Sequence, residues 1–187
     1  MKRVIFLHGV GGSGAAMRPL AQELALPLEA QFPDGSEPFH IGQGRQWFSV
    51  AGVSEANRPG RVAAALDAFR NVVESFGDPR DSLLIGFSQG AIMALHAVAA
   101  GMPSAGVFAL SGRLAGAVPP RAGWPSIWLL HGSADRVMPP EIAQATEGWL
   151  LEAGAAPRLQ IFGGLGHAVD ERTIEAIRTG VKLLQAQ

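Results

Sequence analysis

Residues 82–100, SLLIGFSQGAIMALHAVAA, determine how the rest of the chain is interpreted. Ser82–Phe87 is a short apolar run, which is typical of a strand buried on both faces of a sheet. Gln89–Ala100 is rich in alanine, with other apolar residues between, and predicts a buried helix. Because Gly86 and Gly90 flank the junction, a sharp turn is expected between strand and helix, with the Ser88 hydroxyl projecting above the end of the sheet.

The same strand and helix alternation extends over the whole chain. The expected strands are Arg3–Leu7, Pro27–Phe32, Ser82–Phe87, Gly106–Leu110, Ser126–Leu130 and Arg158–Phe162, and the expected helices are Ala15–Leu24, Pro59–Phe76, Gln89–Ala100, Pro140–Ala153 and Glu171–Ala186. We expect the segment 111–123, rich in Gly and Pro, to be a loop. This order predicts an α/β fold with a mostly parallel, doubly wound six-stranded sheet. Ligands of such sheets bind beyond the carboxyl ends of the strands.

The composition fits one domain spanning residues 1–187 and excludes several classes of protein. Hydrophobic residues make up 48% of the chain and charged residues 17%, so the chain is too apolar to be disordered. The net charge is −1 and no basic run is present, which argues against nucleic-acid binding. The absence of cysteine excludes thiol nucleophiles, disulfides and thiolate metal sites.

The chain start and the hydropathy pattern indicate where the protein works. Met1–Leu7 has too few apolar residues for the core of a signal peptide, and no stretch approaches the roughly 18 apolar residues of a membrane span. We therefore expect a cytoplasmic protein without a membrane span. The sequence does not indicate an oligomeric state.

Two polar residues follow later strands in the order that a nucleophilic serine requires. Asp135 follows the fifth expected strand, and His167 follows the sixth. A serine hydroxyl is a weak nucleophile until a histidine accepts its proton and a carboxylate orients that histidine. The order of serine, acid and histidine is that of α/β hydrolases. We therefore predict a catalytic triad of Ser88, Asp135 and His167.

Other titratable residues leave alternatives open. Asp170 or Glu171 could replace Asp135 as the acid. Together with His167 they form too small a set for a metal site, so no metal is expected. His8 and His131 each precede a glycine, and we expect their ring nitrogens to bind nearby backbone rather than substrate.

The loop Gly9–Gly14 after the first strand allows two interpretations. Its G-x-G-x-x-G pattern, with Asp34 20 residues after Gly14, is typical of a dinucleotide-binding oxidoreductase. In a hydrolase sheet, the same loop would instead supply the backbone N–H of Val10 to an oxyanion hole, beside the N–H of Gln89. We favour the second interpretation because it explains four loops rather than one, and Asp34 is then a turn residue.

Several apolar residues are candidates for the substrate pocket. Trp47 and Phe48 follow the second strand, although a packing role would explain them equally well. Leu165 and Met138 lie close in sequence to the predicted base and acid. A catalytically silent binding module on the same fold also stays open, because a fold does not fix a function.

Four sequence blocks carry a resemblance to a known family. They are LHGVGG (7–12), GFSQGA (86–91), HGSADRVMP (131–139) and GLGH (164–167), and they resemble the phospholipase/carboxylesterase family of α/β hydrolases, which includes the acyl-protein thioesterases. GRQWFSVAG (44–52) is similar to a small bacterial serine esterase subgroup. The resemblance implies the triad and the oxyanion amides given above. It also implies a serine carboxylic-ester hydrolase that forms an acyl-enzyme, with an acyl thioesterase as the alternative and no cofactor.

Two features depart from the family pattern. Gly12 stands where members usually carry an aspartate, and Ser13 is expected to replace its hydrogen bonds as a helix N-cap. The first expected strand is also the one that leads into the oxyanion loop, so we expect a trimmed sheet. Because no segment is long enough for a lid domain, we expect an open site that takes short-chain soluble esters rather than long-chain lipids.

Overall fold

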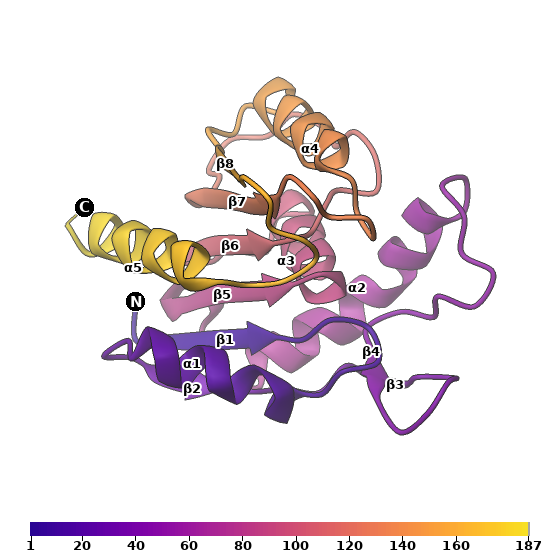
Figure 1. Cartoon of the computed structure of the whole chain (residues 1–187), viewed down its shortest axis with the longest axis horizontal. Coiled ribbons are helices and arrows are strands. Elements are labelled where there is room, and N and C mark those ends of the chain that lie inside the picture. The colour runs from indigo at the N-terminus through magenta and orange to yellow at the C-terminus, as the bar shows by residue number, and fades with distance from the viewer. Residues whose placement is uncertain (187) are drawn as a thin grey trace.

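The computed structural model describes residues 1–186 and arranges six strands in one parallel sheet. The strands are β1 (Arg3–Leu7), β2 (Glu29–Gln31), β5 (Ser82–Phe87), β6 (Gly106–Leu110), β7 (Ile127–Gly132) and β8 (Arg158–Phe162), in the spatial order β2-β1-β5-β6-β7-β8. Every neighbouring pair is parallel. Because β1 lies beside β5, the loops that follow these two strands meet at the same edge of the sheet (Figure 1).

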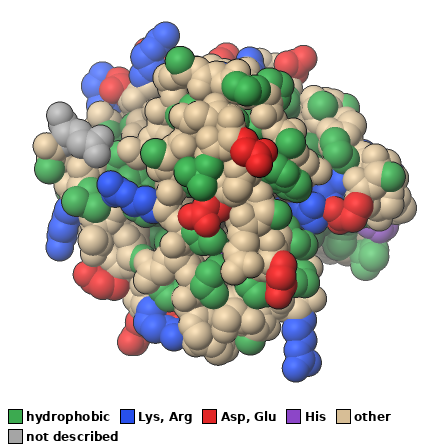
Figure 2. All heavy atoms as spheres, turned by 90° about the horizontal axis from the view of Figure 1, so that it is seen from above, with side chains coloured by type: hydrophobic (Ala, Val, Ile, Leu, Met, Phe, Trp, Pro, Cys, Tyr) green, Lys and Arg blue, Asp and Glu red, His purple; other side chains and the backbone are tan. Residues whose placement is uncertain are grey.

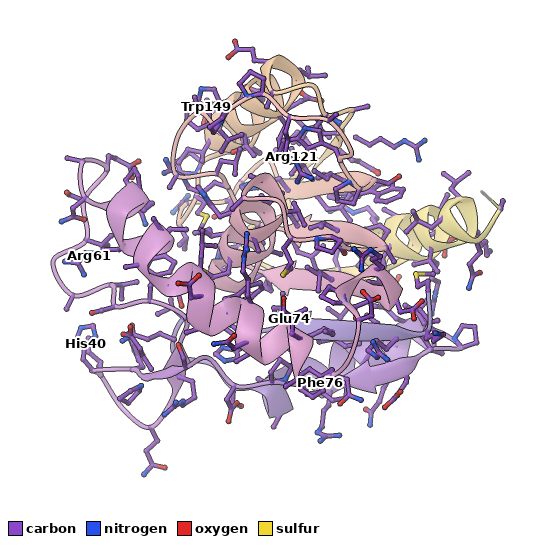
Figure 3. The ribbon with its side chains drawn as sticks, turned by 180° about the vertical axis from the view of Figure 1, so that it is seen from behind. His40, Arg61, Glu74, Phe76, Arg121 and Trp149 are labelled. Carbon is purple, nitrogen blue, oxygen red and sulfur yellow. The ribbon has the colours of Figure 1, made fainter. Side chains whose placement is uncertain are left out.

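Helices cover both faces of the sheet, as the doubly wound pattern predicts. One face carries α1 (Arg18–Leu24) and α5 (Glu171–Gln185), and the other carries α2 (Arg58–Glu74), α3 (Gln89–Ala99) and α4 (Pro140–Glu152). Figure 3 shows the second face, where α2 crosses in front of α3 and ends near Glu74 and Phe76. The fold is therefore a doubly wound α/β sheet, and its central strands are covered on both sides.

Alternate side chains of the central strands fill two separate apolar layers. Ile5 and Leu84 belong to the layer beneath α2 and α3, with Phe69 of α2. Phe6 and Phe108 belong to the layer beneath α1 and α5. This alternation follows from the two-residue period of a strand, and it explains why these strands are apolar at almost every position.

The two outer strands differ from the prediction of strands buried on both faces. β2 has three residues, and Glu29 and Ala30 are exposed. In β8, exposed residues alternate with partly buried ones until the buried Phe162. The reason is that an edge strand has one neighbour and only partial helix cover, so it does not require a continuous apolar run.

Three short elements complete the fold. The expected helix at 15–24 begins as a 3₁₀ turn (Gly14–Met17), where the Ser13 hydroxyl accepts a hydrogen bond from the Ala16 N–H at 3.4 Å, and α1 follows. A second 3₁₀ turn (Pro79–Asp81) precedes β5. A two-stranded hairpin of β3 (Glu37–Pro38) and β4 (Arg45–Gln46) was not predicted. The Ser13 cap agrees with the sequence, and the segment 111–123 is irregular as expected.

The surface and the connections are simple. Figure 2 shows acidic and basic side chains interspersed among apolar and polar ones on the face it displays. Over residues 1–186, the segments between the strands form no separate lid domain. No helix in this range is both long enough and apolar enough to cross a membrane.

Candidate active site

Ser88 occupies a strained turn between β5 and α3. Its backbone has φ 52° and ψ −115°, a conformation that side-chain-bearing residues rarely adopt. A Cβ atom at Gly86 would lie 2.6 Å from the Ala91 nitrogen, and one at Gly90 would lie 2.3 Å from the Leu7 carbonyl oxygen. Only glycine fits at both positions, which is why the sequence G-x-S-x-G can make this turn.

The main sheet holds the backbone of Ser88 in place. The Ser88 N–H donates to the carbonyl of Leu110 in β6 at 2.8 Å, which extends the parallel hydrogen-bond ladder one residue beyond β5. The Ser88 carbonyl accepts from the Ile92 N–H at 3.1 Å, in the first turn of α3. The turn is therefore held from both sides, and this offsets its backbone strain.

Asp135 and His167 form a hydrogen-bonded pair at the same edge of the sheet. His167 Nδ1 lies 2.7 Å from Asp135 Oδ2. Asp135 Oδ1 accepts hydrogen bonds from the N–H groups of Val137 and Met138, each at 2.9 Å. Because a carboxylate only accepts, the Nδ1 of His167 carries the proton, and its Nε2 is left as a hydrogen-bond acceptor.

The Asp135 carboxylate is ionised despite its burial. Its side chain is 0% exposed. Burial alone would raise the pKa of this group, but hydrogen bonds from Met138, His167 and Val137 outweigh that cost and hold the pKa of Asp135 below its usual value. A carboxylate in this state fixes the orientation and the tautomer of the His167 ring.

A second histidine supports the same carboxylate. His131 Nε2 lies 2.7 Å from the Met138 carbonyl oxygen and 3.4 Å from Asp135 Oδ2. Since a carbonyl only accepts, this nitrogen carries a hydrogen, and His131 fixes the turn that contains Asp135. The expectation that His131 binds nearby backbone is thus confirmed, and its proximity to Asp135 is an additional finding.

The loops after β7 and β8 contact each other closely. The Ala134 N–H donates to the Leu165 carbonyl at 2.8 Å. A Cβ atom at Gly132 would lie 2.2 Å from that same oxygen, so only glycine allows the approach. The His167 ring lies against the ring of Phe87, the residue before Ser88, with 5.0 Å between centroids. Among residues 1–186, no hydrogen bond joins the Ser88 hydroxyl to His167; such bonds often tighten only when substrate is bound.

The loop after β1 lies against the Ser88 turn. A Cβ atom at Gly9 would lie 3.2 Å from Ser88 Cβ. Neither the Val10 N–H nor the Gln89 N–H donates a hydrogen bond to another group within residues 1–186. Both amides are therefore available to an oxygen atom bound near Ser88.

The Gln89 side chain has a role that sequence reasoning missed. Its Oε1 accepts from the Trp47 N–H at 2.8 Å, and its Nε2 donates to the Phe48 carbonyl at 2.7 Å. The indole N–H of Trp47 donates in turn to the His8 carbonyl at 2.9 Å. Gln89 and Trp47 therefore join the segment 47–48 to both turns at the site.

The glycine-rich loop does not have the free amides of a dinucleotide site. The Gly11 N–H donates to Arg45, the Gly12 N–H to Gly9, and the Gly14 N–H to the Asp34 carboxylate at 2.7 Å. A pyrophosphate would have to displace these bonds. Asp34 thus anchors the loop, which is more than the turn role expected of it.

His8 helps to hold this loop in place. Its Nδ1 lies 2.7 Å from the Gly9 carbonyl oxygen, and its Nε2 accepts from the Gly35 N–H at 2.9 Å. Burial lowers the pKa of His8, so the ring stays neutral with its proton on Nδ1. His8 therefore binds nearby backbone, as the sequence predicts.

A cavity of about 410 Å³ adjoins Ser88, within the usual range of roughly 300–1,000 Å³ for ligand sites. Ser88 and Gln89 contribute to its wall, as do the expected pocket residues Phe48 and Met138. The other two expected pocket residues do not line it. Trp47 is 1% exposed and packs edge-on against Phe69, and Leu165 packs into the layer under α1 and α5.

The alternative acid residues have other surroundings. Asp170 caps α5 by accepting from the Thr173 N–H at 3.0 Å, and it pairs with Arg172. Glu171 is exposed in the first turn of α5. Within residues 1–186, no three His, Asp or Glu side chains come close enough together to hold a metal ion. Among these acids, the hydrogen bond to His167 belongs to Asp135.

Comparisons with known proteins agree with this fold. The family model for phospholipase/carboxylesterase matches residues 1–185. The chain is 38% identical over 186 residues to esterase YpfH of Escherichia coli (strain K12), a match that covers 92% of this chain and 78% of the relative. It is 26% identical over 202 residues to carboxylesterase SOBER1 of Arabidopsis thaliana, covering 96% and 89% of the two chains.

Solved structures give the same architecture. The crystal structure of Arabidopsis thaliana SOBER1 matches with a TM-score of 0.79 and 23% identity, over 98% of this chain and 99% of that one. Zea mays acyl-protein thioesterase 2 matches with a TM-score of 0.77 and 22% identity, over 98% and 93% of the two chains. With the family model and the YpfH similarity, these matches show that the chain belongs to the phospholipase/carboxylesterase family of α/β hydrolases.

Proposed function

We propose that this protein is a serine carboxylic-ester hydrolase that acts on short-chain esters through an acyl-enzyme. The observation that carries the proposal is the hydrogen bond of 2.7 Å between His167 and the ionised Asp135, beside the strained Ser88 turn. Such a pair supplies the base that a serine alcohol lacks. The cavity of about 410 Å³ next to Ser88 suits a small acyl group.

The reaction follows from the protonation states of these groups. His167 Nε2 takes the proton of the Ser88 hydroxyl as its oxygen attacks the ester carbonyl. The negative charge that develops on the carbonyl oxygen is stabilised by the N–H groups of Val10 and Gln89. His167 then protonates the departing alcohol. It later removes a proton from a water molecule as the water oxygen attacks the acyl carbonyl. It returns this proton to Ser88 Oγ as the bond between Oγ and the acyl carbon breaks, which releases the acid. These steps require no cofactor.

Oxygen esters are the proposed substrates rather than thioesters. The same groups would attack either carbonyl, but the relative that is 38% identical is an esterase. Matched oxygen and sulfur esters of butyrate separate the two activities. A kcat/KM at least equal for the oxygen ester supports the proposal, and a strong preference for the thioester overturns this part of it.

The experiment that tests the mechanism compares wild type with Ser88→Ala. The variant should fold, fail to hydrolyse p-nitrophenyl butyrate and fail to react with a fluorophosphonate that labels wild type at Ser88. Ser133→Ala is the matched control. Ser133 follows β7 and its hydroxyl accepts from the Gly164 N–H at 2.9 Å, so it should keep both labelling and turnover. Full activity of Ser88→Ala would contradict the proposal.

A further inference from the structure

Three charged side chains line the cavity beside Ser88. They are Glu55, which precedes α2, Arg58 in the first turn of α2, and Arg113 in the loop after β6. The Arg113 side chain is 9% exposed, whereas that of Glu55 is 67% exposed. None of the three takes part in the reaction proposed above.

Glu55 binds both arginines. Arg113 forms a two-pronged pair with it, from Nη1 to Oε1 at 3.1 Å and from Nη2 to Oε2 at 2.7 Å. Arg58 Nη2 reaches Oε1 at 3.0 Å. The hydrogen bonds from Arg113 lower the pKa of Glu55, so the carboxylate is ionised. The three side chains together carry a net charge of +1.

Most of the remaining hydrogen-bonding capacity of the cluster consists of donors. The Glu55 carboxylate, which offers about four acceptor sites, already accepts three hydrogen bonds, while each guanidinium has five N–H groups. Arg113 uses three of its nitrogens, with Nε donating to the Leu114 carbonyl at 2.9 Å. Arg58 uses only Nη2, and its buried Nε has no partner within residues 1–186. A ligand group that suits this cluster must therefore be an anion or a strong acceptor.

The cavity belongs to the acyl side of the ester. Its wall contains Ser88, Val10 and Gln89, the groups that would hold the reacting carbonyl, but not His167. Because His167 protonates the departing alcohol, the alcohol must lie on the His167 side of Ser88. The acyl chain then extends into the cavity that contains the two arginines.

We propose that the enzyme selects esters whose acyl chain ends in a carboxylate, that is, monoesters of short dicarboxylic acids. The inference rests on the proposed esterase function and specifies its substrate class. The carboxylate binds the free donors of Arg58 and competes with the exposed Glu55 for Arg113. Planar guanidinium groups suit this exchange because they bind a carboxylate through two parallel hydrogen bonds.

The test compares two nearly isosteric substrates, monomethyl adipate and methyl 6-amino-6-oxohexanoate, whose acyl chains end in a carboxylate and in a neutral amide. Hydrolysis is followed in a pH-stat, and the measured quantity is the ratio of kcat/KM for the acid to that for the amide. The ratio in wild type should be about ten, because charge-assisted hydrogen bonds to a carboxylate are the stronger ones. A ratio of one or less overturns the inference.

Three variants locate the origin of this ratio. Arg58→Gln and Arg113→Gln should each lower it toward one, and Glu55→Gln should raise it because the competing carboxylate is gone. Arg80→Gln is the control. The Arg80 side chain is 75% exposed and pairs with Asp78, so its replacement should leave the ratio unchanged. If Arg113→Gln does not fold, the ratios measured for Arg58→Gln and Glu55→Gln still test the proposal. Ratios that match wild type in both would overturn the proposal.

Failure of the inference can be distinguished from failure of the proposed function. Hydrolysis of the amide-ended ester that requires Ser88, without preference for the acid, would reject only the acyl selectivity. No hydrolysis of either ester, or of p-nitrophenyl butyrate, would reject the esterase function itself. A carboxylate on the alcohol, as in acetoxyacetic acid compared with acetoxyacetamide, should give a ratio near one.

Discussion

Two carboxylates near Ser88 are held in opposite ways. Asp135 is fully buried and accepts from two backbone amides and a histidine, all on the neighbouring β7 and β8 loops. Glu55 is 67% exposed, and within residues 1–186 its carboxylate is held only by the side chains of Arg58 and Arg113. A buried carboxylate with fixed backbone donors keeps one geometry, whereas an exposed one can be displaced by a ligand. This difference fits the two proposed roles: a fixed orientation of His167 on one side of Ser88, and exchange with a substrate carboxylate on the other.

The largest expected effect comes from changing the buried carboxylate. Asp135→Asn keeps an oxygen for the Val137 and Met138 amides, but it can present a donor N–H to His167 Nδ1 and so stabilise the wrong tautomer. We expect kcat to fall by about 10⁴ with the fold intact, measured with p-nitrophenyl butyrate and by circular dichroism. Asp170→Asn is the control, since Asp170 caps α5 and should change kcat by no more than a few-fold. A loss below tenfold in Asp135→Asn would contradict the role given to this carboxylate.

A second prediction concerns His96, a largely buried histidine whose pKa is affected by the charge of Arg113. Burial and the charge of Arg113 lower the pKa of His96 to about 4, from 6.5 in the unfolded chain, and His96 Nε2 accepts from the Ala115 N–H at 2.8 Å. Between about pH 6.5 and pH 4, His96 binds a proton in the unfolded chain but not in the folded protein. The free energy of unfolding therefore falls as pH decreases through this range. The loss from His96 should reach about 2 kcal/mol between pH 7.5 and pH 5.

Urea unfolding of wild type and His96→Gln at both pH values measures this contribution. Glutamine can accept the same hydrogen bond but does not titrate, so the variant should lose less stability than wild type on acidification. Equal losses in the two proteins would contradict a lowered pKa of His96 in the folded protein.

A smaller effect is expected from the histidine that supports Asp135. His131→Phe removes the hydrogen bond to the Met138 carbonyl and the contact with Asp135. We expect kcat to fall by about tenfold with little change in KM, because the acid would be less well oriented. His131→Gln keeps a donor and should recover part of the loss. If His131→Gln and His131→Phe have the same kcat, the hydrogen bond from His131 to the Met138 carbonyl has no role in positioning Asp135.

The smallest change should come from salt, which we expect to affect the exposed Glu55 cluster more than the buried Asp135. Raising ionic strength from 0.05 M to about 1 M shortens the Debye length to about 3 Å, which screens exposed charges more than buried ones. The preference for an acid-ended acyl chain should therefore decline a few-fold, while kcat for the amide-ended ester changes little. If the preference does not change with salt, the charged groups in the cavity are more shielded from solvent than the exposed fraction of the Glu55 side chain, 67%, indicates.

Local sequence signals predicted the central sheet and its junctions well. Ser82–Phe87, Gly106–Leu110 and Arg158–Phe162 form strands with the predicted bounds. They are followed by Ser88, Ser111 and Gly163, so where each strand ends is indicated by nearby sequence. The pairing of Asp135 with His167 agrees with the order of the strands, because the carboxyl ends of neighbouring parallel strands meet at one edge.

Features that depend on contacts distant in sequence could not be predicted. The pair of β3 and β4 has two residues in each strand and no apolar alternation, and it is held partly by Arg45, whose N–H donates to the Gly12 carbonyl at 2.8 Å. Glu55 and Arg113 lie 58 residues apart and meet only in the folded chain. For Trp47 the sequence left a pocket role and a packing role equally open, and the contact with Phe69 of α2, distant in sequence, decides for packing.

The buried Trp47 gives this enzyme an optical reporter of its own active site. Its indole N–H binds the His8 carbonyl, two residues before Val10, and its backbone N–H binds the Gln89 side chain. Loosening of either turn would expose this indole to water and shift its fluorescence to longer wavelength. Since Trp124, Trp128 and Trp149 lie elsewhere in the chain, replacing all three by phenylalanine would isolate the Trp47 signal and allow the site to be followed during unfolding or acylation.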